Sequence, residues 1–206
     1  MTRTLEQAAG VASTCTACAL ASSRKQVVYG AGDPHARLMF IGEAPGFHED
    51  RKGEPFIGAA GSLLTGLIES IGLTRGDVYI ANVLKCRPPA NRDPLPEEID
   101  ACKPWLKEQI ELVDPSVICT LGNFSSKLLL GTKIGVSRLR GRRIPWRGRT
   151  LIPTFHPAAV LHSGRNSDTM RAMEQDFQLI SKALEERSDP VLDAPTDISA
   201  EQLGLF

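Results

Sequence analysis

Four cysteines are the residues whose type and spacing most clearly suggest chemistry in this chain. Cys15 and Cys18 form a C-x-x-C pair, whereas Cys86 and Cys102 lie far along the sequence. Two thiolates with this spacing can bind one metal centre from a single turn, and two distant thiolates can complete its coordination. The four cysteines therefore predict a metal centre, iron–sulfur or zinc, that ties the N-terminal segment to the middle of the fold. A fifth cysteine, Cys119, lies in an apolar run and is predicted to be a buried core residue.

Polar residues that follow short apolar runs form the second candidate set. The turn Gly42–Gly46 follows one run, Asn82 follows the next, Gly122-Asn123 follows a third, and His156 follows the last. In open α/β sheets, ligands bind beyond the carboxyl ends of the strands. These groups are thus expected to converge on one mouth, although a single His or Asn at a strand end is more often a local hydrogen-bonding device.

The elements that position these residues indicate an α/β fold. The apolar runs are almost continuous in hydrophobicity, which is typical of strands covered on both faces. They span residues 38–41, 78–81, 117–121 and 151–155. Helical patterns lie between or after them, at residues 60–71, 96–113, 124–130 and 169–186, with Ser167-Asp168 as the cap of the last helix. This alternation predicts a parallel sheet with helices on both faces.

Composition limits the class of protein. The 206 residues are 42% hydrophobic and 23% charged, which suits one sizeable globular domain. We expect this domain to span residues 1–187 and a flexible C-terminal tail to span 188–206. A long apolar run and an apolar signal core are both missing, which predicts a cytoplasmic protein with no membrane association. Cysteines stay reduced in the cytoplasm, which favours metal ligation over disulfides.

Charge is informative only locally, because the net charge is zero. Residues 138–149 carry six arginines and no acid. Such a loop can hold phosphates, or it can be a solvated hairpin.

Several motifs together resemble the uracil-DNA glycosylase superfamily. They are Gly42-Glu-Ala-Pro-Gly46 with Glu49-Asp50, Glu54-Pro-Phe56-Ile-Gly58, Asn82-Val-Leu-Lys-Cys86-Arg-Pro-Pro and His156-Pro-Ala-Ala159. The four-cysteine pattern is similar to that of family 4, the iron–sulfur branch. The resemblance covers the chain from Cys15 to about Lys182.

This resemblance implies a fold and a reaction. The fold would be a three-layer α/β/α sandwich around a four-stranded parallel sheet. Cys15, Cys18, Cys86 and Cys102 would hold a [4Fe-4S] cluster with a mainly structural role. The reaction would hydrolyse the N-glycosidic bond of a uracil flipped out of DNA and leave an abasic site, without a lyase step.

The resemblance also implies roles for pocket residues. Phe56 would stack on the base. The Asn82 amide would donate to uracil O4 and accept from N3–H, a pattern that cytosine reverses. His156 would stabilise the negative charge that develops on O2. Gly42 and the backbone of Glu43 and Ala44 would complete the pocket.

The resemblance does not identify which residue would position the attacking water. The best-known branch carries an aspartate where this chain has Ala44. Glu43 is the first candidate for a substitute, and Glu49 is the second. The tyrosine that excludes thymine in that branch corresponds to Gly46 here, so Glu49 or nearby backbone would have to fill the space.

DNA contacts are expected around the pocket. Val160 and Leu161 are placed either to wedge into the vacated base stack or simply to pack in the core. Phosphate contacts are expected from Lys85, Arg87, Arg165 and the arginine loop.

Specific residues bear on two alternative functions. A non-catalytic iron–sulfur DNA-damage-binding protein is favoured by the absence of a carboxylate at Ala44. A branch that becomes covalently trapped on DNA carries a histidine in the loop after the second motif, and residues 87–96 have none. The peptide Gln202–Phe206 resembles the segment by which bacterial repair proteins bind the DNA polymerase sliding clamp. The protein is otherwise expected to act as a monomer.

Overall fold

A single mixed sheet organises the protein. The computed structural model describes residues 3–163 and 167–186. The strand order is β1-β3-β2-β4-β6-β5. The strands are β1 (Ala31–Gly32), β2 (Leu38–Gly42), β3 (Tyr79–Asn82), β4 (Val117–Leu121), β5 (Ile144–Trp146) and β6 (Arg149–Thr154). The four central strands β3, β2, β4 and β6 run parallel, as predicted, and each lies within two residues of its expected bounds.

The sheet has six strands rather than the expected four. The additional strands β1 and β5 pair antiparallel at the two edges. Neither has the apolar signature of a central strand: β1 has two residues, and β5 contains Pro145 in an arginine-rich segment. Proline suits an edge strand because it cannot donate a ladder hydrogen bond. Strand β5 joins β6 through a tight turn at Arg147 and Gly148, which both have positive φ angles.

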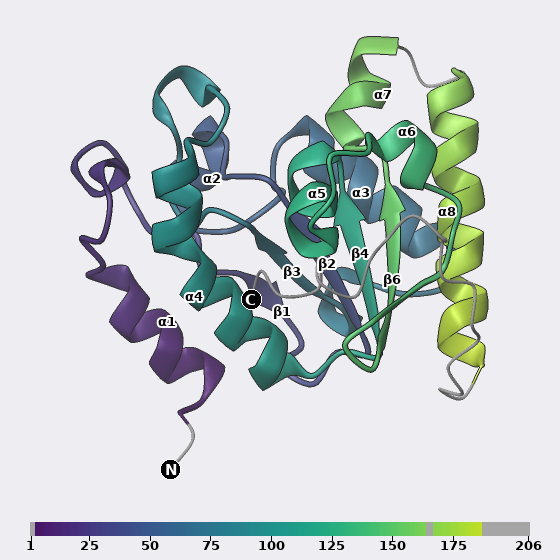
Figure 1. The fold of residues 1–206 in the computed structure, drawn as a ribbon, viewed down its shortest axis with the longest axis horizontal. Helices are drawn as coiled ribbons and strands as arrows, with labels where there is room; N and C mark the ends of the chain where they lie inside the picture. Colours follow the sequence, from purple (N-terminus) through teal and green to yellow (C-terminus); the bar gives the residue numbers. More distant parts are fainter. Residues whose placement is uncertain (1–2, 164–166, 187–206) are drawn as a thin grey trace.

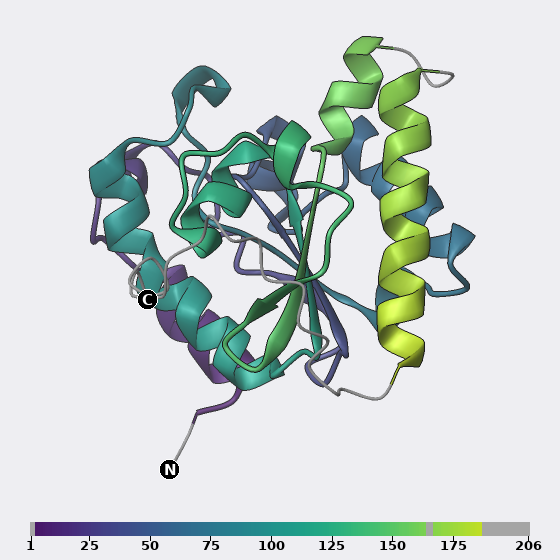
Figure 2. The same cartoon turned by 45° about the vertical axis from the view of Figure 1, so that its right-hand side comes forward.

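Helices cover both faces of the sheet (Figures 1 and 2). The α-helices are α1 (Leu5–Ser13), α2 (Phe47–Lys52), α3 (Ala59–Ser70), α4 (Pro96–Val113), α5 (Asn123–Leu130), α6 (Val136–Leu139), α7 (Pro157–Ser163) and α8 (Asp168–Glu185). Short 3₁₀ turns span Ala19–Ser22, Arg75–Asp77 and Pro89–Asn91. Ser167 caps α8 as expected, because its side chain accepts a hydrogen bond from the Met170 N–H at 3.3 Å.

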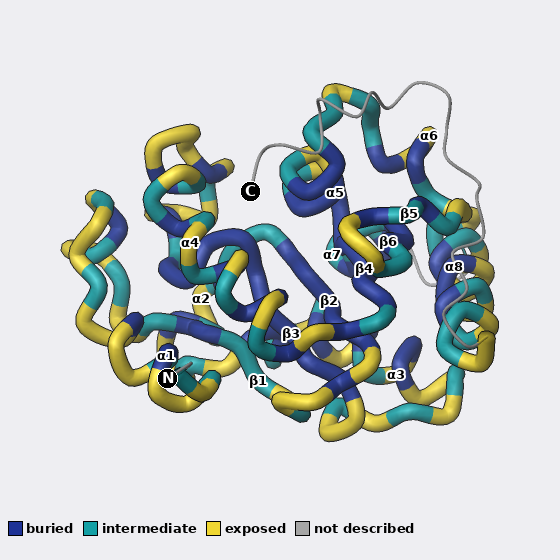
Figure 3. Tube along the Cα trace, turned by 60° about the horizontal axis from the view of Figure 1, so that its bottom comes forward, coloured by how far each residue is buried: buried dark blue, intermediate teal, exposed yellow. Residues whose placement is uncertain are grey.

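Alternation along the strands divides the core into two clusters. In β2, Met39 and Ile41 face a cluster built with α4 and α5, whereas Leu38 and Phe40 face α3 and α8. The central strands β2, β3 and β4 are completely buried, as the dark blue tube in Figure 3 shows. This confirms the three-layer α/β/α sandwich. Among the described residues, no helix is long and apolar enough to cross a bilayer.

Candidate active site and cysteine-lined hollow

Gly42 lies at the centre of the candidate site, at the carboxyl ends of β2 and β3. It pairs in register with Asn82 of β3. A Cβ added at Gly42 would lie 2.4 Å from the Asn82 Oδ1 atom and 2.6 Å from the Phe56 ring. Both distances are too short for a side chain, so only glycine allows the amide and the ring to meet here. The positions of Gly42 and Asn82 at the ends of apolar runs predicted that they would lie close together, whereas Phe56 was expected here only from the family resemblance.

Phe56 is held in an uncommon backbone conformation. Its φ angle is +52°, a left-handed value that costs an L-residue roughly 1–2 kcal/mol. The Arg75 guanidinium donates hydrogen bonds to the Phe56 and Pro55 carbonyls at 3.1 and 2.8 Å. Gly61 makes room for this turn, because a Cβ there would lie 1.7 Å from the Phe56 carbonyl oxygen. Sequence reasoning missed Arg75, since it lies outside the quoted motifs and in a turn with no strand or helix period.

His156 is the third side chain of the candidate site, beside Asn82 and Phe56. It follows β6, and its ring centroid lies 5.6 Å from that of Phe56, with 33° between the planes. The Ala158 N–H donates to the His156 Nδ1 atom at 3.2 Å. Burial lowers the pKa of His156 to about 4, despite the opposing effect of Glu49. The imidazole is therefore neutral near pH 7, and because Nδ1 accepts a hydrogen bond, Nε2 carries the proton and can donate it.

Asn82, the last residue of β3, has an unsatisfied hydrogen-bond acceptor. Its side chain is only 2% exposed. Its Oδ1 atom is buried and has no hydrogen-bond partner within the described part of the chain. A buried acceptor without a partner costs about 1–3 kcal/mol. A ligand that supplies an N–H group at this point would remove that cost.

Two carboxylates flank the pocket in different environments. Burial, with a smaller contribution from Asp93, raises the pKa of Glu43 to about 7. Glu49 is engaged differently: one of its oxygens accepts hydrogen bonds from the Ile57 and Gly58 N–H groups, both at 3.2 Å. Its other oxygen lies against Gly46, where an added Cβ would be 2.7 Å away. Glu49 therefore ties α2 to the turn that carries Phe56.

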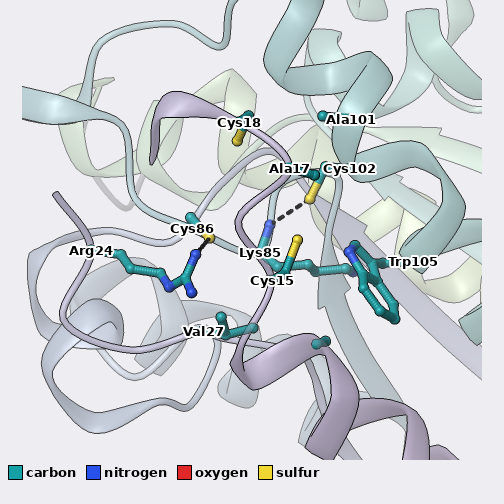
Figure 4. A pocket seen from close by; sticks show the side chains of 11 residues that line it. Cys15, Ala17, Cys18, Arg24, Val27, Lys85, Cys86, Ala101, Cys102 and Trp105 are labelled. Atoms are coloured by element: carbon teal, nitrogen blue, oxygen red, sulfur yellow. Dashed lines mark hydrogen bonds between the residues drawn. The ribbon is translucent and has the colours of Figure 1, made fainter. Parts of the chain in front are cut away.

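The four predicted cysteines line one hollow (Figure 4). Cys86 lies in the loop after β3 and Cys102 lies on α4, whereas Cys15 and Cys18 come from the segment after α1. The four thiols are close enough for Cys15 and Cys18 to raise the pKa of Cys86, although burial is the larger cause. Across residues 3–163 and 167–186, no three His, Cys, Asp or Glu side chains are grouped tightly enough to be the ligands of one metal ion, so the four cysteines share the hollow without being drawn together.

Donors reach two of the sulfur atoms. The Lys85 backbone N–H lies 3.2 Å from Cys102 Sγ, and the Arg24 guanidinium lies 3.5 Å from Cys86 Sγ. Burial raises the pKa of Cys102 to about 11. A buried thiol of this kind is protonated at neutral pH, so a thiolate here requires nearby positive charge, such as that of a bound metal. Cys119 is fully buried on the opposite face of the sheet, as predicted.

Lys85 cannot be the phosphate contact expected from the sequence. It is 1% exposed, and its ammonium group donates to the Asn82 carbonyl oxygen at 2.7 Å and to the Gln109 side chain. Gln109 in turn donates to the Tyr29 carbonyl oxygen and the Tyr79 hydroxyl. The position of Lys85 beside Cys86 turns it inward, where it supports the strand end that carries Asn82.

The remaining predicted DNA contacts fall into separate groups. Val160 is fully buried in the core, which corrects the wedge assignment for this residue, whereas Leu161 is 42% exposed. Arg165 lies outside the described residues. Three loop arginines form ion pairs instead of remaining available to phosphates; the pairs are Arg140–Asp176, Arg143–Glu186 and Arg149–Asp114. The turn of the arginine hairpin also lies at the start of β6, at the opposite end of the sheet from His156.

The fold and the site define a class of protein. The model of the uracil DNA glycosylase superfamily matches residues 29–178, and the chain belongs to this superfamily.

Curated relatives narrow the assignment further. The chain is 44% identical over 177 residues to a type-4 uracil-DNA glycosylase of Sulfurisphaera tokodaii, covering 81% of this chain and 79% of that protein. It is 45% identical over 166 residues to the type-4 enzyme of Thermotoga maritima, covering 80% and 86%. It is 41% identical over 188 residues to that of Archaeoglobus fulgidus, covering 87% and 93%. These similarities place the chain with the type-4 branch.

Proposed function

We propose that this protein excises uracil from DNA by hydrolysing its N-glycosidic bond, and that it acts as a monofunctional enzyme. The unsatisfied Asn82 Oδ1 atom carries the proposal. It lies beside the Phe56 ring, where a flipped uracil would supply the missing donor through its N3–H group. The names of the type-4 relatives support an enzyme over a non-catalytic damage-binding protein.

Each pocket residue has a proposed task. Phe56 stacks on the base, and the Asn82 amide pairs with N3–H and O4. Cytosine has no hydrogen on N3, so it would leave the Oδ1 atom unpaired, which discriminates strongly in a buried site. His156, neutral and protonated on Nε2, donates to O2 as negative charge develops there. No proton has to leave the imidazole for this stabilisation to occur.

Glu43 is the proposed water-positioning base. Its raised pKa leaves it partly ionised near pH 7, so it can accept a proton from water at neutral pH. Glu49 is less suited to this task, because one of its oxygens is occupied by two backbone N–H groups. We therefore assign Glu49 to positioning Phe56.

Cys15, Cys18, Cys86 and Cys102 would hold the [4Fe-4S] cluster. The donor set is the one that such clusters use. Four cysteines can also bind zinc, and the resemblance of the four-cysteine pattern to the iron–sulfur branch favours the cluster. The bound cluster would supply the positive iron centres that keep the four thiolates ionised, including the buried Cys86 and Cys102, and would tie the segment after α1 to α4.

The wider assignments remain part of the proposal. We expect a monomer that works on uracil-containing DNA in the cytoplasm. The clamp-binding peptide Gln202–Phe206 and the tail from residue 188 lie outside the described residues, so they rest on the sequence resemblance alone.

The function is tested with a uracil-containing oligonucleotide and the variant Asn82→Asp. The wild-type protein should create alkali-sensitive sites at uracil. A carboxylate at position 82 cannot donate to O4, so the variant should excise uracil about 10–100-fold more slowly. The ratio of uracil to cytosine excision should also fall. If the wild-type protein leaves the strand intact after alkali, it is not a glycosylase; if the variant matches the wild type, Asn82 does not read the base.

The pH dependence of excision tests Glu43. The rate should rise with pH to a plateau, with a midpoint near 7, because Glu43 must lose its proton to act as a base. Glu43→Gln should abolish the rise in rate near pH 7 and lower the plateau rate about 10-fold. This reduction is smaller than the one expected when the group that stabilises the leaving-group charge is removed. Asp93→Asn should move the midpoint to lower pH, since the Asp93 charge raises the pKa of Glu43. The exposed Glu69→Gln variant is the matched control. If Glu43→Gln keeps the same midpoint, Glu43 is not the base.

A further inference from the structure

An exposed aromatic side chain lies directly after the pocket loop. Phe47 is the first residue of α2 and is 47% exposed. The guanidinium carbons of Arg51 and Arg87 lie 5.4 and 5.2 Å from the centroid of its ring. The two arginines come from different elements, since Arg51 is on α2 and Arg87 follows Cys86. A large apolar ring at the surface thus serves as a support for two cations.

Both cations lack a neutralising partner in the described ranges. None of the ion pairs found there involves Arg51 or Arg87, in contrast to the paired arginines of the 138–149 loop. The Arg87 Nε atom donates to the Asn91 side-chain oxygen at 2.7 Å, which fixes the orientation of that guanidinium. Arg51 and Arg87 therefore present two positive charges on one aromatic ring that a phosphate group could bind.

An arginine that rests on an aromatic ring loses little further freedom when it binds an anion. Contact with the ring orients the guanidinium plane and leaves edge N–H groups for a phosphate. Phosphate contacts of this kind position DNA without reading its sequence. The cluster also lies near the pocket, because Phe47 follows Gly46 and Arg87 is close in sequence to Asn82.

We propose that Phe47, Arg51 and Arg87 form a phosphate clamp for the DNA strand that carries the flipped uracil. This inference rests on the proposed function and adds the surface that grips the strand. The backbone of an extruded nucleotide stays at the pocket mouth, so a clamp one residue from the pocket loop reaches its neighbouring phosphates. The clamp needs no complementary strand, which suits it to single-stranded DNA.

The test measures binding of a short fluorescent single-stranded oligonucleotide without uracil, at salt concentrations between about 50 and 200 mM. Each phosphate contact on a single strand contributes about 0.7 to the slope of log affinity against log salt. The double variant Arg51→Gln, Arg87→Gln should therefore reduce the slope by about 1.4. Lys52→Gln removes an exposed charge from the same helix and is the matched control, with a clearly smaller change.

Phe47→Leu separates the support from the charges. It keeps both arginines and an apolar side chain but removes the aromatic face, so affinity should fall about 3–10-fold while the salt slope is retained. The clamp is refuted if the double variant changes the slope no more than Lys52→Gln, or if Phe47→Leu binds as tightly as the wild type. Uracil excision by the wild-type protein is measured in parallel. Its absence would refute the proposed function, whereas excision with an unchanged slope would refute the clamp alone.

Discussion

Replacing His156 with alanine should slow uracil excision by about 10²–10³-fold in single-turnover assays. We expect a large loss because we propose that the neutral imidazole donates from Nε2 to O2 of the departing base. The Ala158 N–H fixes the donor by occupying Nδ1 at 3.2 Å. Binding of uracil-containing DNA should weaken far less than the rate, because the charge on O2 develops only as the bond breaks.

The pH profile gives this prediction a second readout. Burial holds the pKa of His156 at about 4, so the ring stays neutral from about pH 5 upward and contributes no step of its own there. The His156→Ala variant should retain the rise near pH 7 that we assign to Glu43. His35→Ala, at an exposed turn, is the control and should behave as wild type. A wild-type rate in His156→Ala would show that the leaving group is stabilised elsewhere.

Replacing Cys102 with alanine should remove iron from the purified protein and lower its Tm by about 10 °C or more. A metal site that joins distant segments contributes its binding energy to folding. A loss of roughly 3–5 kcal/mol corresponds to such a shift in a chain of this size. The segment after α1 should become the part most open to proteolysis, because Cys15 and Cys18 would lose their anchor on α4.

Cys119→Ala supplies the matched control for this result. Cys119 is equally buried but lies on the other face of the sheet, so its loss should leave iron content unchanged and cost on the order of 1 kcal/mol. Iron content and visible absorption at about 400 nm can both be measured without an activity assay. Retention of full iron content by Cys102→Ala would exclude this residue as a ligand.

The sequence predicted the central elements because burial on both faces leaves a clear pattern. Val117–Leu121 is completely buried and matches its expected bounds, and α4 begins at Pro96 as proline at the first helical turn suggests. The edge strands were missed because their pairing depends on neighbours rather than on their own composition. Helix α2 was missed because it has only six residues, too few to show a helical period.

The candidate site was predictable in membership but not in detail. Gly42 and Asn82 end strands β2 and β3 and His156 lies just after β6, so their convergence follows from topology. The inward direction of Lys85 could not be read from a motif, because a lysine beside Cys86 is equally compatible with the surface. Arg75 and the cation pair on Phe47 depend on contacts between segments that the sequence separates. The two residues expected to wedge into DNA differ in exposure, because α7 directs Val160 toward the core and Leu161 toward the solvent.

Lys85 gives the molecule a short mechanical link between two regions that are usually considered apart. Its backbone N–H reaches Cys102 Sγ, and its ammonium group reaches the Asn82 carbonyl oxygen. A displacement of α4 at Cys102 would therefore be transmitted within a few residues to the amide that we expect to read the base. We therefore expect that a change in the cysteine-lined hollow would also alter how accurately the protein selects its base.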